Sequence, residues 1–327
     1  MFTAPRTLKM ARVFLFATSL AFKMTTHSEQ RGQDKDKVNR IVKKAKNSVA
    51  VRAVDDFVQD GMTIGIGTGN TTFFVVERLG ELVASGTLKD ISVVPLNKVT
   101  EKHCQQANLP IRLMDDVTMD DPIDVLIDSA DEVDAQLNLL KGSKGSLVRE
   151  RMMWSASLQR VVVVSNEDKL VKRLGLSAPL SCEVVPWGCE FVRGNIASSP
   201  GMKNSRVVQR YGTVTTPFPD GLRPAVTENG NYVLDIFFDS PIQDAHQLDM
   251  ELASLPGLVS HGLFVGLATT VSAAQPYCLL LFTLTPHAHP HPHPHPHSSS
   301  SPLFSHPHPH AANARRSFAF AGPKQTS

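Results

Sequence analysis

The chain has 327 residues, a formal net charge of +2 and 42% apolar residues, enough for one large or two modest domains with a buried core. A charge so close to zero leaves no large basic face, so nucleic acid is a poor candidate partner. The four cysteines form no CxxC pair, and we interpret them as reduced thiols.

The two ends differ in composition from the middle of the chain. Residues 1–28 are basic, contain no acid and enclose an apolar run over 13–22, which is too short to span a bilayer. Such a leader is typical of an organelle transit peptide or a signal peptide, and a start codon set too early is a third explanation. From Pro286 onward His and Pro alternate, which excludes helix and sheet interior. We expect a leader over 1–35, a folded domain over 36–285 and a disordered tail over 286–327.

Apolar runs alternate with amphipathic segments in the first half of the folded domain. Strands are expected over 62–66, 91–95, 111–114, 123–127 and 161–164, and helices up to 58 and over 73–82, 100–107 and 147–157. This alternation predicts an α/β fold, a parallel Rossmann-like sheet with helices on both faces.

Beyond Cys182 the pattern changes and predicts a smaller α+β subdomain over about 182–255. The expected strands are 183–186, 207–215, 232–238 and 258–266, and the expected helices are 188–197 and 242–255.

Two clusters of polar residues follow expected strands. Gly67–Thr72 lies between a strand and a helix, where backbone N–H groups can bind a phosphate. The turn is neither GxGxxG nor a Walker loop, so a capped tight turn explains it about as well. Asp128, Asp131 and Glu132 follow the strand over 123–127, at the end of a parallel sheet where ligands bind.

A glycine-bearing loop with Lys141 and Lys144 comes next, and then a helix with Ser146 as a plausible N-cap and Glu150 near its start. Acids and lysines on short loops of one sheet could surround a small polyhydroxy substrate. For any single residue, surface charge is the alternative, and a carboxylate such as Glu150 also suits a helix start.

Taken together, these residues closely resemble type A ribose-5-phosphate isomerase, particularly its plant and algal forms. The resemblance runs from about 38 to 271, and its motifs are GTGNTT at 67–72, DSADE at 128–132, KGSKGSLVRE at 141–150 and NEDK at 166–169. It implies an aldose-ketose isomerase of the non-oxidative pentose phosphate pathway that interconverts D-ribose 5-phosphate and D-ribulose 5-phosphate through a cis-enediolate. It also implies a homodimer in the cytoplasm or a plastid, with no cofactor and no metal.

The resemblance also implies roles for individual residues. Glu150 would be the general base, with Asp128 and Lys141 as further catalytic groups. A single base held over one face can serve both carbons if burial tunes its pKa, and a lysine can stabilise the developing oxyanion. The substrate-binding residues would be Thr68, Gly69, Asn70, Thr71, Asp128, Ser129, Ala130, Asp131, Lys141, Gly142, Ser143, Lys144 and Lys169.

Several positions depart from the family pattern. Ser129 stands where the family usually has glycine and Asn70 where it usually has serine, and Ser143 and Lys144 are unusual in the lysine loop. Ungapped alignment puts Asn47 at a phosphate-binding lysine, with Lys46 one residue away.

Two alternatives remain open, of which the first is suggested by Ser129 and Ser143. One is a sugar-phosphate-binding protein with impaired catalysis, which the retained Glu150, Asp128, Asp131 and Lys141 weigh against. The other is a sugar-phosphate deaminase or coenzyme A transferase with the same sheet, which the lysine loop followed by Glu150 weighs against.

Overall fold

The computed structural model describes residues 39–165, 167–215, 223–274 and 279–283. The leader expected over 1–35 and the tail expected over 286–327 lie outside the described residues, as does Cys278.

Five parallel strands and one antiparallel edge strand form the central sheet, in the order β13-β12-β6-β3-β1-β2. Their bounds are β1 (Thr63–Ile66), β2 (Ser92–Pro95), β3 (Ile123–Ser129), β6 (Ser157–Val164), β12 (Thr270–Ala274) and β13 (Leu279–Thr283). The predicted parallel sheet is confirmed. Its fifth parallel strand, β12, begins at Thr270, where the resemblance inferred from the sequence ends at about 271.

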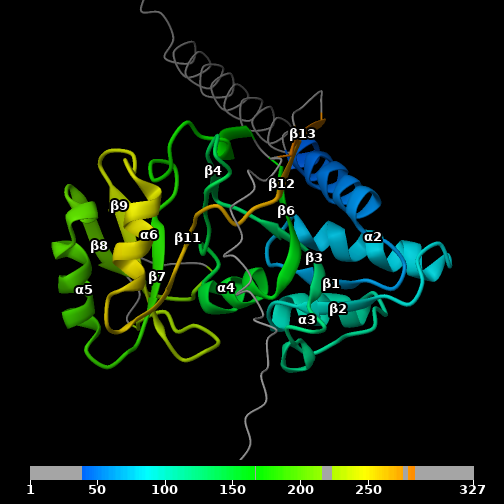
Figure 1. The fold of residues 1–327 in the computed structure, drawn as a ribbon, viewed down its shortest axis with the longest axis horizontal. Coiled ribbons are helices and arrows are strands. Elements are labelled where there is room, and N and C mark those ends of the chain that lie inside the picture. Colours follow the sequence, from blue (N-terminus) through cyan, green and yellow to red (C-terminus); the bar gives the residue numbers. More distant parts are fainter. Residues whose placement is uncertain (1–38, 166, 216–222, 275–278, 284–327) are drawn as a thin grey trace, which may run out of the picture. The chain divides into compact units, whose positions relative to one another are not determined.

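Alternate residues of the central strands enter two separate cores, because side chains of a strand point to opposite faces of its sheet. Val161 and Val163 cluster with the helix over 39–57, with α2 (Thr72–Ala84) and with Cys104 of α3 (Lys98–Gln106). Val162 and Val164 cluster instead with Met153 and Trp154 of α4 (Leu147–Ser155). Figure 1 shows α2 and α4 on opposite sides of the parallel strands, so the prediction of helices on both faces is confirmed.

A second, antiparallel sheet has the order β10-β7-β9-β8. Its strands are β7 (Leu180–Val184), β8 (Ser205–Gln209), β9 (Tyr232–Phe238) and β10 (Leu258–His261), and α5 (Cys189–Ser198) and α6 (Ala245–Ala253) pack on its apolar face. The alternate residues Ser181, Glu183 and Asp235 are polar and buried on the other face. There Glu183 Oε2 accepts a hydrogen bond from Val148 N at the start of α4 (3.2 Å), which ties this sheet to the helix that carries Glu150.

A third sheet of three short strands carries the lysine loop. It consists of β4 (Glu132–Val133), β5 (Leu139–Leu140) and β11 (Leu263–Phe264), in the order β11-β5-β4. Lys141 follows β5 directly and donates its backbone N–H to Gly262 O (2.8 Å). A Cβ at Gly262 would lie 2.1 Å from Lys141 O, so only glycine permits this approach.

Some element predictions were wrong in detail. The strand expected over 111–114 is reduced to a single bridge between Ile111 and Val93, because a 3-10 helix begins at Met114. The strand expected over 183–186 is β7, which begins and ends earlier, and the extended segment expected over 207–215 leaves the sheet after Gln209. The strand expected over 258–266 is divided at Gly262 between two sheets.

Candidate active site

The carboxyl ends of β1 and β3 meet where the strand order changes direction. The strand β1 lies between β2 and β3, so successive crossovers move to opposite sides of it. Gly67 follows β1 and donates its N–H to Ile127 O in β3 (3.0 Å). A Cβ at Gly67 would meet Asp128 Oδ1 at 1.9 Å, so the carboxylate lies directly against the turn. Ligands of open α/β sheets bind at such switch points.

The turn from Gly67 to Thr71 is held in one conformation and leads into α2. Gly69 has a φ of +132°, and its carbonyl accepts from Thr72 Oγ1 (2.9 Å), while Gly67 O accepts from Thr100 Oγ1 (3.1 Å). Within the described residues, the backbone N–H groups of Asn70, Thr71 and Thr72 have no acceptor. Unpaired N–H groups at the start of a helix are suited to an anion.

Asp128, Lys141 and Glu150 come together in the interior from three different elements. Lys141 Nζ lies 2.8 Å from Asp128 Oδ2 and 3.6 Å from Glu150 Oε1, and it donates to Ser129 O. Asp128, Lys141 and Glu150 are 0%, 2% and 3% exposed. Glu150 Oε2 is buried and has no hydrogen-bond partner among the described residues. One carboxylate oxygen is therefore available to a group that enters the site.

Burial changes the proton affinities of Glu150 and Lys141. It raises the pKa of Glu150 to about 7; the charges of Asp128 and Asp131 act in the same direction, and Lys141 opposes them. Burial also disfavours the charged form of Lys141, but Asp128 and Glu150 outweigh it and raise the pKa of the ammonium. At neutral pH, Glu150 can therefore both accept and release a proton while Lys141 stays charged.

The two unusual serines connect the loops of the site. Ser143 donates both its N–H (3.0 Å) and its hydroxyl (2.6 Å) to the carboxylate of Asp131. Ser129 Oγ donates to Thr68 O (3.1 Å), which joins the end of β3 to the turn after β1. Both departures from the family pattern thus make hydrogen bonds between site loops.

Lysine side chains gather beside this turn. Lys169 Nζ donates to Ala130 O (2.5 Å). Burial lowers the pKa of Lys169; the charge of Asp131 opposes this, and the smaller contributions of Lys141, Lys46 and Lys144 lower the pKa further. Lys46 is half-buried, whereas Asn47 next to it is exposed. A cluster of lysines with this mutual repulsion is stabilised by a bound anion.

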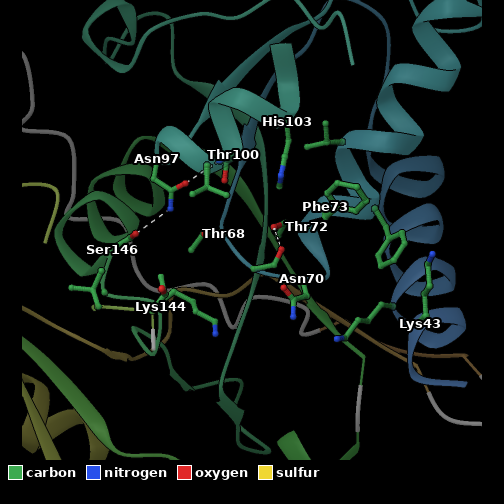
Figure 2. Close-up of a pocket in the computed structure, with 18 of the residues that line it drawn as sticks. Lys43, Thr68, Asn70, Thr72, Phe73, Asn97, Thr100, His103, Lys144 and Ser146 are labelled. Carbon is green, nitrogen blue, oxygen red and sulfur yellow. Dashed lines mark hydrogen bonds between the residues drawn. The ribbon is translucent and has the colours of Figure 1, made fainter. Parts of the chain in front are cut away.

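Two adjoining cavities open beside the trio. They have volumes of about 600 and 430 Å³ and share Val42, Lys46, Gly69, Asn70 and Lys144 as lining residues. Figure 2 shows the larger cavity, with Asn97, Thr100 and Ser146 joined by hydrogen bonds on one side and Phe73 and Lys43 on the other.

The structure brings the predicted site residues together around the smaller cavity. Its lining includes Gly69, Asn70, Thr71, Ser129, Asp131, Ser143, Lys144 and Lys169. Thr68 lines the larger cavity. The carbonyl of Ala130 accepts from Lys169, and that of Gly142 accepts from Gly145 N within the lysine loop. Asp128, Lys141 and Glu150 are buried and line neither cavity.

One residue of the site was not predicted from the sequence. The indole N–H of Trp154 donates to Asp128 Oδ2 (3.1 Å). The available signal was its position four residues after Glu150, which puts both side chains on one face of α4. Ser146 occupies the predicted N-cap position but makes no side-chain cap, because its hydroxyl accepts from Asn97 Nδ2 instead (3.2 Å).

Comparisons with known proteins agree on one family. Residues 92–277 match the family model for ribose 5-phosphate isomerase A (phosphoriboisomerase A). A probable ribose-5-phosphate isomerase 1 of Arabidopsis thaliana is 38% identical over 73% of this chain and 87% of its own. A chloroplastic relative from the same plant, probable ribose-5-phosphate isomerase 3, is 34% identical over 79% of this chain and 86% of its own. The solved ribose 5-phosphate isomerase of Plasmodium falciparum superposes with a TM-score of 0.68, at 32% identity over 74% of this chain and 99% of its own.

The chain belongs to the ribose 5-phosphate isomerase A family. The resemblance inferred from the motifs is therefore confirmed, and so is the similarity to plant forms. For this isomerase A chain, the matched residues include β3, the lysine loop and α4, while the turn over 67–72 lies before the matched range.

The described residues hold neither a candidate metal site nor a helix able to span a membrane. Within the ranges that the structure describes, no group of three or more His, Cys, Asp or Glu side chains is arranged to hold a metal ion. In the same ranges, none of the helices of this isomerase A chain combines the length and apolar character needed to cross a bilayer.

Proposed function

We propose that this protein interconverts D-ribose 5-phosphate and D-ribulose 5-phosphate, with Glu150 as the single base that moves a proton between C2 and C1. Membership of the isomerase A family supports the reaction. The observation that carries the assignment of the base is a buried carboxyl group with a pKa of about 7, 3.6 Å from a buried ammonium.

In this proposal the ionised Glu150 removes the C2 proton of the open-chain aldose, and the electron pair forms a cis-enediolate. The charge that develops on the sugar oxygen is stabilised by Lys141, whose pKa is raised, so that it stays charged through the cycle. The protonated Glu150 then returns the proton to C1 on the same face, while the proton of the C2 hydroxyl passes to O1 and the C2 carbonyl of the ketose forms. A carboxyl pKa near the working pH suits both transfers, because neither protonation state is strongly favoured.

Phosphate binding is proposed at the turn over Thr68–Thr71, together with Lys46 and Lys169. The unpaired N–H groups of Asn70, Thr71 and Thr72 and the lysine charges support this site. The phosphate lies away from the reacting carbons of the sugar. Binding energy gained at the phosphate would therefore hold C1 and C2 in position for the proton transfer.

The sugar hydroxyls are proposed to contact Asp131, Ser143 and Lys144, which line the smaller cavity. Asp128 has a different environment: Ser129 N, Lys141 Nζ and Trp154 Nε1 all donate to its two oxygens. Because these donors occupy most of its acceptor capacity, Asp128 acts on the substrate chiefly through Lys141.

Access to Glu150 requires a movement, since the base is only 3% exposed. Gly142 and Gly145 have φ values of +97° and +74°, so the backbone at both ends of the loop adopts conformations that favour glycine. We propose that substrate entry displaces this loop and that its return excludes water from the enediolate.

The alternatives that the sequence left open, an impaired binding protein or a sugar-phosphate deaminase, are not favoured by the comparisons. We further propose a homodimer in the cytoplasm or in a plastid; the named chloroplastic relative supports the plastid. Sedimentation of the purified protein tests the oligomeric state, and a sedimentation coefficient for one chain would contradict the dimer.

The experiment that tests the function is an assay of the purified protein with ribose 5-phosphate in deuterium oxide. We expect ribulose 5-phosphate to form and solvent deuterium to be incorporated at the carbon that receives the proton. No ribulose 5-phosphate formed at all would contradict the proposed function, whereas the fraction of original hydrogen retained at C1 measures how well the closed site keeps solvent from the protonated Glu150.

A further inference from the structure

Trp154 lies against the reacting groups without lining either cavity. It is 1% exposed, and its indole N–H donates to Asp128 Oδ2 at 3.1 Å. Lys141 Nζ lies 2.8 Å from the same oxygen and 5.8 Å from the centre of the indole ring. The ammonium is therefore bounded on one side by a carboxylate and on another by an aromatic face.

The orientation of this indole is fixed by its neighbours. Its ring meets Phe264 of β11 edge to face, with centroids 5.2 Å apart and planes at 65°. Phe264 is fully buried and also lies 5.8 Å from Lys141 Nζ. Packing against Phe264 thus directs the indole N–H at Asp128. A buried indole N–H usually has a hydrogen-bond partner, and here the partner is Asp128.

The hydrogen bond matters because Asp128 Oδ2 is shared. Without the indole donor, the ammonium would be the remaining donor to this oxygen among the contacts described, since Ser129 N bonds Oδ1 (2.7 Å). The attraction between Asp128 and Lys141 would then increase, and the ammonium would move away from Glu150 Oε1, which is already 3.6 Å away.

We propose that Trp154 is a positioning residue for the isomerisation: its N–H shares Asp128 Oδ2 with Lys141 and thereby keeps the ammonium within reach of both Glu150 and the substrate oxygen. This inference rests on the proposed function. It assigns Trp154 no contact with the substrate; it acts through Asp128 on the position of Lys141.

The consequence for Glu150 has a defined sign. The charged groups that face this carboxyl are Lys141, Asp128 and Asp131; Lys141 lowers its pKa and the two carboxylates raise it. If the ammonium withdraws, the lowering contribution weakens and the pKa of Glu150 rises further. The pH below which activity is lost then moves upward.

The test compares Trp154→Phe, which keeps an aromatic ring against Phe264 but removes the donor, with the matched control Trp187→Phe, whose side chain is 91% exposed. For Trp154→Phe we expect kcat to fall by about tenfold, the value of one modest charge-assisted hydrogen bond. KM for ribose 5-phosphate should change by less than about twofold because phosphate contacts lie elsewhere. The acid limb of the kcat profile should move to higher pH, and the control should match wild type.

A second measurement does not depend on turnover. The chain has two tryptophans, so the indole N–H region of a nitrogen-15 spectrum holds two resonances, and Trp187→Phe assigns them. The Trp154 resonance should exchange slowly with solvent and shift in Asp128→Asn. A Trp154 resonance unaffected by Asp128→Asn would overturn the hydrogen bond on which the proposal depends.

The kinetic outcomes separate this inference from the function itself. An active wild type whose Trp154→Phe variant has unchanged kcat and pH profile would overturn the positioning role alone. The same follows if the variant loses activity only in proportion to its loss of folded protein. A wild type inactive on ribose 5-phosphate would overturn the proposed function and this inference with it.

Discussion

Glu150 combines two properties that are uncommon in one carboxyl group: it is almost completely buried, and one of its oxygens has no partner among the described residues. An unpaired buried acceptor costs free energy, so its presence calls for an explanation such as a role in the reaction. The proposed proton transfer is such a role.

Replacing Glu150 by Gln removes the base and keeps the size of the side chain. We expect kcat to fall by roughly 10²–10⁴-fold, the usual contribution of a general base, while KM stays near its wild-type value. Initial-rate kinetics and exchange of the C2 proton with deuterium oxide measure this. Exchange at the wild-type rate in Glu150→Gln would exclude Glu150 as the base.

The pKa of Glu150 also sets a pH dependence. Burial raises this pKa to about 7, and the base works only when ionised. Activity should therefore be lost as pH falls through about 7 and be retained above it, with kcat/KM reporting the free enzyme. The substrate phosphate titrates near pH ~6, so a single bend at that lower pH, unchanged in Glu150→Asp, would assign the profile to the substrate instead.

At this scale the sequence predicted which residues meet but not how they are connected. The motifs were sufficient for Asp128, Lys141 and Glu150, because loops at the carboxyl end of a parallel sheet converge. Trp154 was missed because a tryptophan in a helix usually means core packing, and only its distance to Asp128 reveals a polar contact. The burial of Asp128, Lys141 and Glu150 could not be predicted either, since no local sequence pattern indicates it and only the structure shows it.

Among the elements, the turn after β1 depends most on a single small residue. A Cβ at Gly67 would overlap Asp128 Oδ1 at 1.9 Å. Gly67→Ala must therefore displace the carboxylate or open the turn. We expect a loss of unfolding free energy of about 1–3 kcal/mol from overpacking and a large loss of activity, measured by urea unfolding and initial rates. Gly194→Ala in α5, with nothing within 4 Å, is the control; it should leave activity unchanged and should not lower the free energy of unfolding, because alanine is the better helix former.

The first helix, over 39–57, contributes Lys46 to both cavities, and Asn47 to neither lining. Lys46→Ala should raise KM and weaken inhibition by inorganic phosphate, since one cation near the anion is lost, while kcat changes little. Asn47→Ala is the matched neighbour and should behave as wild type. If Asn47→Ala raised KM and Lys46→Ala did not, phosphate would contact the other face of this helix.

Most elements were predictable because their apolar residues recur with the spacing typical of a strand or of a helix. The strand over 123–127 is an apolar, buried run broken only by the half-buried Asp124, and α2 and α6 show the spacing of amphipathic helices. The segment over 111–114 has the composition of a strand, but only Ile111 reaches the sheet edge, so pairing rather than propensity decided the outcome. The division at Gly262 was not visible because residues 258–264 are extended on both sides of it.

For the whole molecule, buried carboxylates connect parts that are distant in sequence. Glu132 of β4 accepts N–H groups from Gly175 (2.6 Å), Ser177 (2.5 Å) and Ala178 (2.8 Å), just before β7. Glu132→Gln puts an amide donor among these donors. We expect a loss of about 1.5–3 kcal/mol in the free energy of unfolding, the range for hydrogen bonds to a charged group.

Urea denaturation of Glu132→Gln measures this effect, and Glu77→Gln on the exposed face of α2 is the control. The control should stay within about 0.5 kcal/mol of wild type. An equal loss in both variants would show that general charge balance, rather than the link between β4 and β7, determines the change.

The contact between Lys141 and Gly262 also bears on when the enzyme becomes active during its synthesis. A ribosome produces Asp128, Lys141 and Glu150 together, well before Gly262, whose carbonyl holds the backbone of Lys141 (2.8 Å) and whose N–H bonds Ser181 O (2.8 Å). The strand β12, which completes the parallel run beside β6, is made later still. A nascent chain therefore carries every reacting group long before the segment that fixes the lysine has emerged. Isomerase activity should appear only near the end of translation, when the late strands have docked and closed these long-range contacts.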